Sequence, residues 1–221
     1  MQDSLKNRTI SGMIWSSIGK VGSMGITFIS NMVLARLLMP EDFGCIAMLY
    51  VFIAISSVFV SGGLGSALIQ KKEPTHIDYT TVFYWNIVMS IIFYLLLFFT
   101  APAIGRFYEM PQLRDVLRVQ SLVLLIQSFS LVQSNQLQKQ MRFKELSTRS
   151  ICAALAGMIV AVTMALMGFG VWSLVASAIV SSMTSVLLLW KMSSWRPSLE
   201  FSMTSLKELF SFGGLKIGRA S

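Results

Sequence analysis

Long apolar runs separated by short polar stretches dominate the pattern of this 221-residue chain. An α-helix rises 1.5 Å per residue, so about 20 mostly apolar residues cross the roughly 30 Å of hydrocarbon in a bilayer. Six segments meet this condition: 13–35, 44–69, 82–104, 116–134, 151–168 and 171–190. The pattern predicts an all-α, polytopic membrane bundle of six transmembrane helices within residues 1–195. Residues 196–221 are expected to form a cytoplasmic linker and, from Phe212 to Ser221, the start of a truncated seventh helix.

Polar residues, prolines and glycines separate the expected spans. Breaks are expected at Pro40, in segments 70–78 and 102–118, in the basic stretch 139–149 and at Pro197, because proline cannot continue a helix hydrogen-bond ladder. The fifth and sixth spans are joined only by residues 168–170. This short connection predicts a tight helical hairpin.

The composition indicates that lipid is the main solvent of the protein. Hydrophobic residues make up 54% of the chain and charged residues 13%, whereas about 25% of an ordinary soluble domain is charged. The net charge of +8 would suggest nucleic acid in a soluble protein, but cytoplasmic loops of membrane proteins collect Lys and Arg. We therefore expect membrane lipid, and no nucleic acid, as a partner.

Basic residues gather on one side of the expected bundle. Eleven lie on the side of the N-terminus: Lys6, Arg8, Lys71, Lys72, Lys139, Arg142, Lys144, Arg149, Lys191, Arg196 and Lys207. Four lie on the other side: Arg36, Arg106, Arg114 and Arg118. The positive-inside rule then places the N-terminus of this multi-pass protein in the cytoplasm.

The first span carries a polar stripe through its whole depth. Helical spacing from Lys20 places Ser16, Ser23, Thr27 and Asn31 on the same face. An ionisable residue inside a membrane usually faces a cavity or a partner, which favours a substrate pathway. The alternative is that Lys20 reaches the headgroups with its long side chain.

Two other spans carry weaker polar patches. The fourth span has Gln120, Gln127, Ser130 and Ser134 at compatible spacing, and the third has Asn86 and Ser90. Buried amides and hydroxyls either line a pathway or hydrogen-bond between helices. Both interpretations stay open, and Asn86, Gln120 and Gln127 are candidate pathway residues.

Two features of the fifth and sixth spans indicate helix packing. Small residues recur every fourth position, as Ala153, Gly157, Ala161 and Ala165 in the fifth span and as Ser173, Ser177, Ser181 and Ser185 in the sixth. Small residues at this period let helix backbones approach closely in lipid. The basic stretch 138–149 before them is interpreted as a loop resting on anionic headgroups, or alternatively as an entry funnel.

The spans lack chemical groups that several classes of function require. No Asp or Glu falls inside the six spans, although proton relays and cation sites in transporters are usually built from buried carboxylates. A basic interior favours an anionic substrate, such as a phosphate-bearing lipid, over a cationic drug. The sequence shows no nucleotide-binding glycine loop, no His and Cys metal cluster and no activated nucleophile, so we expect a protein that is not an enzyme and has no cofactor.

Five short motifs, in order along nearly the whole chain, resemble those of a known family. The first is ARLLMPEDFG at residues 35–44, which is similar to an ARLL-x-PEDFG signature after the first span. The others are GLGSALIQKK at 63–72, the stretch 107–119, MRFK at 141–144 and GFGVWSLV at 168–175. Together they resemble the polysaccharide transporter family, which comprises lipopolysaccharide, O-antigen and teichuronic acid flippases of the multidrug/oligosaccharidyl-lipid/polysaccharide exporter superfamily.

The resemblance implies a fold of two six-helix lobes around a central cavity, with residues 1–195 as the N-terminal lobe. It implies a flippase that moves polyprenyl-pyrophosphate-linked oligosaccharides across the bacterial inner membrane for cell-surface polysaccharide synthesis. The pyrophosphate is expected to meet Lys20, with Arg36 at the periplasmic end. Expected partners are a second lobe that this chain lacks, and polysaccharide polymerase and glycosyltransferases. The alternatives are a multidrug-type cation antiporter and a non-transporting membrane scaffold of a polysaccharide assembly complex.

Overall fold

The computed structural model describes the backbone of residues 2–214 and the side chains of residues 11–209. Within these residues the chain forms ten α-helices and no strand. Their bounds are α1 Gln2–Leu37, α2 Pro40–Ser61, α3 Leu64–Gln70, α4 His76–Phe107, α5 Pro111–Gln120, α6 Leu122–Ser128, α7 Leu131–Lys139, α8 Phe143–Leu166, α9 Val171–Met192 and α10 Met203–Gly214. The expected seventh span overlaps the end of α10, and residues 215–221 lie outside the described part of the chain.

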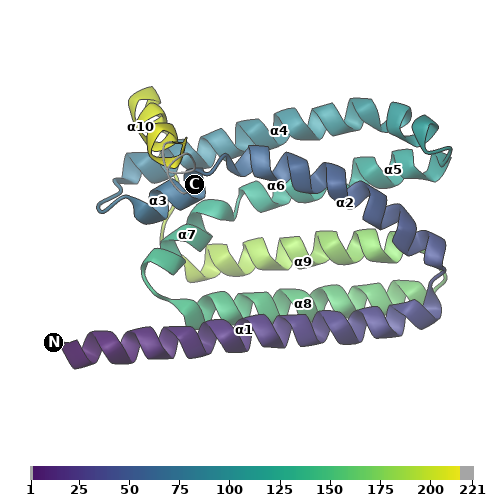
Figure 1. Cartoon of the computed structure of the whole chain (residues 1–221), viewed down its shortest axis with the longest axis horizontal. Coiled ribbons are helices and arrows are strands. Elements are labelled where there is room, and N and C mark those ends of the chain that lie inside the picture. The colour runs from purple at the N-terminus through teal and green to yellow at the C-terminus, as the bar shows by residue number, and fades with distance from the viewer. Residues whose placement is uncertain (1, 215–221) are drawn as a thin grey trace, which may run out of the picture.

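The long helices lie side by side, and their connections gather at the two ends of the molecule (Figure 1). One end, here called the N-terminal end, holds the start of α1 together with α3, α7 and α10. The opposite end holds the turns that join α1 to α2, α4 to α5 and α8 to α9. α1 packs along α8, and α8 packs along α9.

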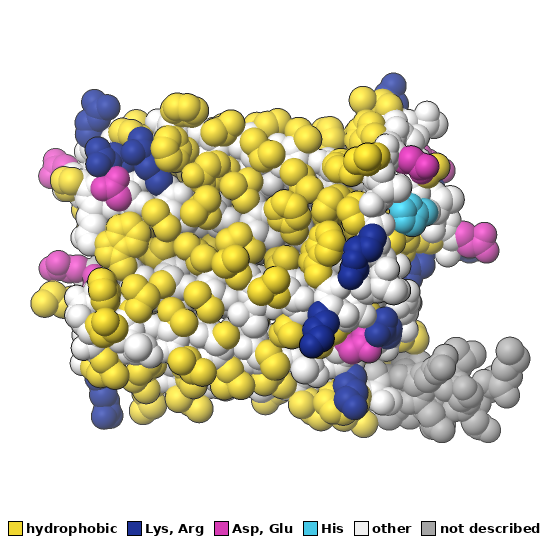
Figure 2. Space-filling view, turned by 180° about the vertical axis from the view of Figure 1, so that it is seen from behind, with side chains coloured by type: hydrophobic (Ala, Val, Ile, Leu, Met, Phe, Trp, Pro, Cys, Tyr) yellow, Lys and Arg dark blue, Asp and Glu magenta, His cyan; other side chains and the backbone are white. Residues whose placement is uncertain are grey.

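The surface and the helix lengths identify a multi-pass membrane protein. Five helices (α1, α2, α4, α8 and α9) are long and apolar enough to cross a membrane. Segments 111–128 and 131–139 pass the same test as a pair bent by 42°, which gives up to six spans. The face of the bundle seen in Figure 2 is apolar across its middle, and the charged side chains on it gather toward the two ends. The predicted all-α membrane bundle is confirmed.

The structure divides two of the expected spans. The span expected at 44–69 ends as α2 at Ser61, and Gly62 and Gly63 then adopt φ values of 52° and 70°, a left-handed conformation that glycine takes at little cost. The span expected at 116–134 is interrupted between α6 and α7. There the indole Nε1 of Trp190 donates a hydrogen bond to the carbonyl of Phe129 at 2.9 Å, so a carbonyl at the break has a partner from α9.

The third span, expected at 82–104, contains an internal proline at Pro102. α4 continues through it to Phe107. Proline has no N–H to donate to the carbonyl four residues earlier, that of Phe98. The guanidinium Nε of Arg118 in α5 donates to this carbonyl at 3.3 Å, and its Cζ lies 4.3 Å from the centroid of the Phe98 ring. A neighbouring helix thus supplies the hydrogen bond that the proline removes, which is how membrane helices tolerate internal proline.

Small residues bring α1, α8 and α9 into close contact. A Cβ added to Gly19 would lie 2.7 Å from the Cα of Ser147 in α8, so only glycine allows this approach. The Ser147 hydroxyl donates to the carbonyl of Trp15 at 2.5 Å. On the other side of α8, the Ser177 hydroxyl of α9 donates to the carbonyl of Gly157 at 2.9 Å. Gly157 therefore serves helix packing, as expected, and Ala161 and Ala165 pack with Leu34 and Leu38.

An ion cluster at the N-terminal end connects α3, α4 and α10. The ammonium of Lys71 lies 2.9 Å from Oδ2 of Asp78, whose side chain is 1% exposed, and 3.2 Å from Oε2 of Glu208. Burial lowers the pKa of Lys71, but its hydrogen bonds to the two carboxylates raise that pKa above its ordinary value. Lys139 at the end of α7 donates to the carbonyls of Leu68 and Lys71. The ends of α3 and α7 are therefore fixed to each other and to α10.

Candidate functional site

Two polar cavities lie between α1, α7, α8 and their neighbours. The cavity nearer the N-terminal end has a volume of about 310 Å³, and the larger one has about 520 Å³. Both are lined by Ser134, Arg149 and Ser150. Because the two cavities share these residues, we describe them together as one polar hollow.

The polar stripe of α1 borders this hollow over most of its length. Ser16, Lys20 and Ser23 line the smaller cavity, and Thr27 lines the larger one. Gly19, which is on the same side of the helix, packs on Ser147. The stripe thus faces α8 and the hollow, although Lys20 is exposed at its edge.

Two candidates at the end of α1 lie elsewhere. Asn31 and Arg36 are exposed, and neither lines either cavity of the hollow. Arg36 is in the last turn of α1, near the opposite end of the bundle, where its positive charge interacts favourably with the helix C-terminus.

Arg149 is the residue that the sequence interpretation missed. The stretch 138–149 was expected to be a loop, but α8 begins at Phe143, so Arg149 lies almost two turns inside the helix. Its Nε atom is buried with no hydrogen-bond partner among the described residues, and its Nη2 lies 3.4 Å from the Ser150 hydroxyl. A signal was present in the sequence: Arg149 is four residues before Ala153 and continues the row of small residues toward the N-terminus of α8.

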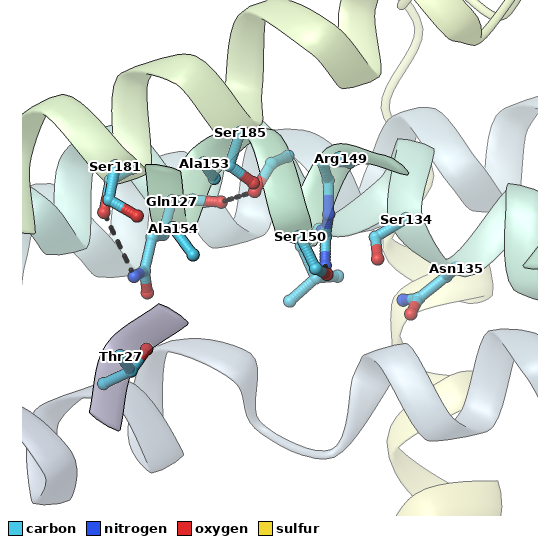
Figure 3. Close-up of a pocket in the computed structure, with 13 residues that line it drawn as sticks. Thr27, Gln127, Ser134, Asn135, Arg149, Ser150, Ala153, Ala154, Ser181 and Ser185 are labelled. Atoms are coloured by element: carbon cyan, nitrogen blue, oxygen red, sulfur yellow. Dashed lines mark hydrogen bonds between the residues drawn. The ribbon is translucent and has the colours of Figure 1, made fainter. Parts of the chain in front are cut away.

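Gln127 borders the larger cavity from α6. Its Nε2 lies 3.5 Å from the hydroxyl of Ser182 in α9, which is the long limit for a hydrogen bond. Figure 3 shows Gln127, Ser181 and Ser185 on one side of Arg149, with Ser134 and Asn135 on the other. Ser181 and Ser185 line the cavity, and Ser181 also packs against Gly157 of α8, as expected.

Gln120 and Asn86 have different surroundings. Gln120 lines a third cavity of about 240 Å³ between α2 and α6, which shares Gln127 with the larger cavity. The Oε1 atom of Gln120 is buried and has no hydrogen-bond partner among the described residues. Asn86 is fully buried and donates to the carbonyl of Val82 at 2.8 Å. Asn86 therefore lies away from the hollow.

The break between α6 and α7 lies at the larger cavity, which Gln127, Ser130 and Leu131 line. Irregular backbone at membrane depth is tolerated where it is buried in protein or lines a cavity. Interrupted helices of this kind commonly form the substrate sites of transporters. The geometry of the break thus supports the hollow as the candidate site.

The hollow is cationic. Lys20 and Arg149 are its charged lining residues, and no Asp or Glu lines either cavity among the residues that the structure describes. The acidic residues of the long helices α2, α4 and α8 lie in first turns, at Glu41, Asp42, Asp78 and Glu145. Two cations surrounded by hydroxyls and amides can bind an anion that also offers hydrogen-bond acceptors.

The fold and the hollow define a multi-pass membrane protein with a cationic polar hollow inside its helix bundle. Comparison with known proteins gives the family: the chain belongs to the polysaccharide biosynthesis protein family, whose model matches residues 33–219. The resemblance inferred from the five motifs is thereby confirmed.

Relatives carry names from polysaccharide biosynthesis. The chain is 30% identical over 216 residues to the succinoglycan biosynthesis transport protein ExoT of Rhizobium meliloti, covering 96% of this chain and 44% of that protein. It is 29% identical to the lipopolysaccharide biosynthesis protein WzxC of Escherichia coli, covering 95% of this chain and 43% of that protein. The chain thus spans less than half the length of these relatives.

Solved structures show the same fold. A MOP superfamily transporter from Pyrococcus furiosus superposes with a TM-score of 0.67 at 16% identity, covering 91% of this chain and 50% of that one. A MATE transporter in complex with Br-NRF superposes with a TM-score of 0.65 at 14% identity, covering 97% of this chain and 57% of that one. At these identities the likeness concerns the fold alone.

Proposed function

We propose that this chain forms the N-terminal lobe of a flippase that moves polyprenyl-diphosphate-linked oligosaccharides across the bacterial inner membrane. The observation that carries the proposal is the pair of cations, Lys20 and Arg149, in a polar hollow whose described lining contains no carboxylate. A diphosphate would bind at these cations, while the polyprenyl tail stays in lipid. The names of the relatives ExoT and WzxC support a polysaccharide precursor as the cargo.

Arg149 has the central role in this proposal. Its guanidinium is planar and offers several donors, a geometry that suits two oxygens of a phosphate. The unpartnered Nε leaves one donor free for a ligand. Lys20 at the edge of the hollow adds a flexible point charge that can follow the diphosphate as it moves.

Transport would require a second bundle. Alternating access is a rocking of one bundle against another around a shared site, and both relatives are more than twice as long as the part that this chain matches. We place residues 1–195 in the first lobe, residues 196–221 in the connection to the second, and the N-terminus in the cytoplasm, as the distribution of basic residues favours. Polymerase and glycosyltransferases would supply and consume the cargo.

The test is export in a bacterial strain whose surface polysaccharide depends on this protein. Arg149→Ala and Lys20→Ala should each reduce export by about tenfold to a hundredfold, since hydrogen bonds to charged groups contribute about 1.5–3 kcal/mol each. Arg149→Lys should restore part of the loss because it retains the charge. Arg114→Ala is the matched control, since this exposed arginine pairs with Asp115 and lies outside the hollow.

Membrane insertion is measured in parallel by size-exclusion chromatography of fluorescent fusions. Normal export by correctly inserted Arg149→Ala and Lys20→Ala proteins would exclude the proposed anion site. A cation antiporter would instead change resistance to cationic drugs. If the protein is a non-transporting scaffold, neither substitution should affect its role.

A further inference from the structure

The lining of the larger cavity is polar but uncharged beyond Arg149. Away from Lys20, its walls carry Gln127 of α6 with Ser181, Ser182 and Ser185 of α9, and Figure 3 shows Gln127, Ser181 and Ser185 together on one side of Arg149. Among the described lining residues of the larger cavity, Arg149 alone is charged. We call these four residues the neutral section.

The amide groups at this section have unused hydrogen-bonding capacity. The bond from Gln127 Nε2 to Ser182 is long at 3.5 Å. The adjoining cavity between α2 and α6, which Gln127 also lines, holds the buried and unpartnered Oε1 of Gln120. Gln127 is exposed and lines both cavities, so its amide is accessible to a ligand with many hydroxyl groups. The buried Oε1 of Gln120 is without a partner among the described residues, whereas buried polar atoms usually have one.

The chemistry of a lipid-linked precursor places a sugar at this position. The first sugar is joined directly to the diphosphate. If Arg149 holds the diphosphate, that sugar lies next to the guanidinium. On the side of Lys20, the hollow continues into the smaller cavity. On the other side lies the neutral section, where amides and hydroxyls both donate and accept hydrogen bonds, as sugar hydroxyls do.

We propose that the neutral section binds the first sugar of the precursor and selects an uncharged one. This inference rests on the proposed function and adds a specificity element to it. An amino sugar would bring an ammonium with no carboxylate to pair it, because none lines the hollow in the described residues. An acidic sugar would add a carboxylate where both cations are already engaged by the diphosphate. Burying an unpaired charge is costly, so both would bind less tightly.

The test compares short-chain analogues on purified protein in nanodiscs. Farnesyl diphosphate probes the cations alone, and farnesyl diphosphate carrying one glucose probes the neutral section as well. In the wild type, glucose should raise the affinity by about tenfold, the equivalent of one or two hydrogen bonds. Replacing glucose with glucosamine or glucuronic acid should remove this gain.

The variants Gln127→Leu and Ser182→Ala should lose the gain from glucose while binding farnesyl diphosphate as before. Ser173→Ala is the matched control on α9, because Ser173 is buried outside the cavities and should keep the full gain. Arg149→Ala should weaken binding of both analogues. Thermal unfolding checks that each variant is folded, and Ser182→Ala, which removes a single hydroxyl, serves as the test if Gln127→Leu does not fold.

The outcomes separate the two proposals. If glucose adds no affinity, or if folded Gln127→Leu and Ser182→Ala proteins keep the gain, the neutral section is not a sugar site, whatever the cations bind. If farnesyl diphosphate binding is insensitive to Arg149→Ala while the glucose gain depends on Gln127, the anion site fails and the sugar site stands. If the wild type binds neither analogue, both proposals are wrong.

Discussion

The contact between Arg118 and the carbonyl of Phe98 gives a quantitative test of how α4 tolerates its proline. Substituting Arg118 with Met keeps an apolar side chain of similar reach but removes the donor that serves the carbonyl left unpaired by Pro102. An unsatisfied buried carbonyl costs about 1–3 kcal/mol, and the stacking of the guanidinium on the Phe98 ring adds about 0.5–2 kcal/mol. The two contributions sum to about 1.5–5 kcal/mol, so we expect Arg118→Met to destabilise the protein by about 2–4 kcal/mol.

A double-mutant cycle separates these two contributions. Pro102→Ala restores an N–H that can donate to Phe98 within the helix. In the Pro102→Ala background, Arg118→Met should therefore lose only the stacking contribution. The coupling between the two substitutions should equal the cost of the unsatisfied carbonyl, about 1–3 kcal/mol.

The measurement is the free energy of unfolding of the purified protein in detergent micelles. Each kcal/mol corresponds to a fall in Tm of about 2–4 °C for a chain of this length. Arg114→Met is the control, because within the described part of the chain Arg114 pairs only with the exposed Asp115 and such surface pairs contribute about 0–1 kcal/mol. An equal cost of Arg118→Met with and without Pro102 would refute the hydrogen-bond explanation.

Two further predictions concern packing and the ion cluster at the N-terminal end. Gly19→Leu should separate α1 from α8 and lower Tm by several degrees, whereas Gly25→Leu on the same helix, where an added Cβ meets nothing within 4 Å, should leave Tm unchanged. Equal Tm values for the two variants would contradict the close approach of the helices. Lys71→Met should leave the buried carboxylate of Asp78 without its cation and destabilise the protein by about 3 kcal/mol. Lys72→Met, which breaks no ion pair among the described residues, should cost less than about 0.5 kcal/mol. Both costs are measured as the free energy of unfolding in detergent micelles.

The spans could be read from the sequence because the bilayer imposes a length and an apolar composition on every helix that crosses it. The places where helices bend depend on contacts between distant segments. Pro102 removes a hydrogen bond from α4, and only the fold shows that Arg118 of the next helix replaces it. The unexpected break at Phe129 carries no proline or glycine, and the Phe129 carbonyl accepts a hydrogen bond from Trp190, 61 residues later. Neither partner can be identified from a local window of sequence.

The candidate site, too, could be predicted from the sequence only in part. The polar stripe around Lys20 was visible because it repeats at helical spacing inside an apolar run. Arg149 was hidden by its neighbours, since Lys139, Arg142 and Lys144 made the whole stretch look like a solvated loop. Because α8 begins at Phe143, Arg149 belongs to this helix and lines the hollow.

The surroundings of Arg149 argue for an anionic ligand on energetic grounds. An arginine at membrane depth is costly, and such residues pair with carboxylates or carbonyls or face water-filled cavities. In this protein the acidic side chains of α2, α4 and α8 lie in first turns, and the hydrogen bond that the guanidinium makes among the described residues is a long one to Ser150, at 3.4 Å. A purely structural role would predict a satisfied guanidinium, yet its Nε is buried without a partner among those residues. Because arginine stays charged in proteins, its remaining donors gain most from an anion that enters the hollow and brings acceptors of its own.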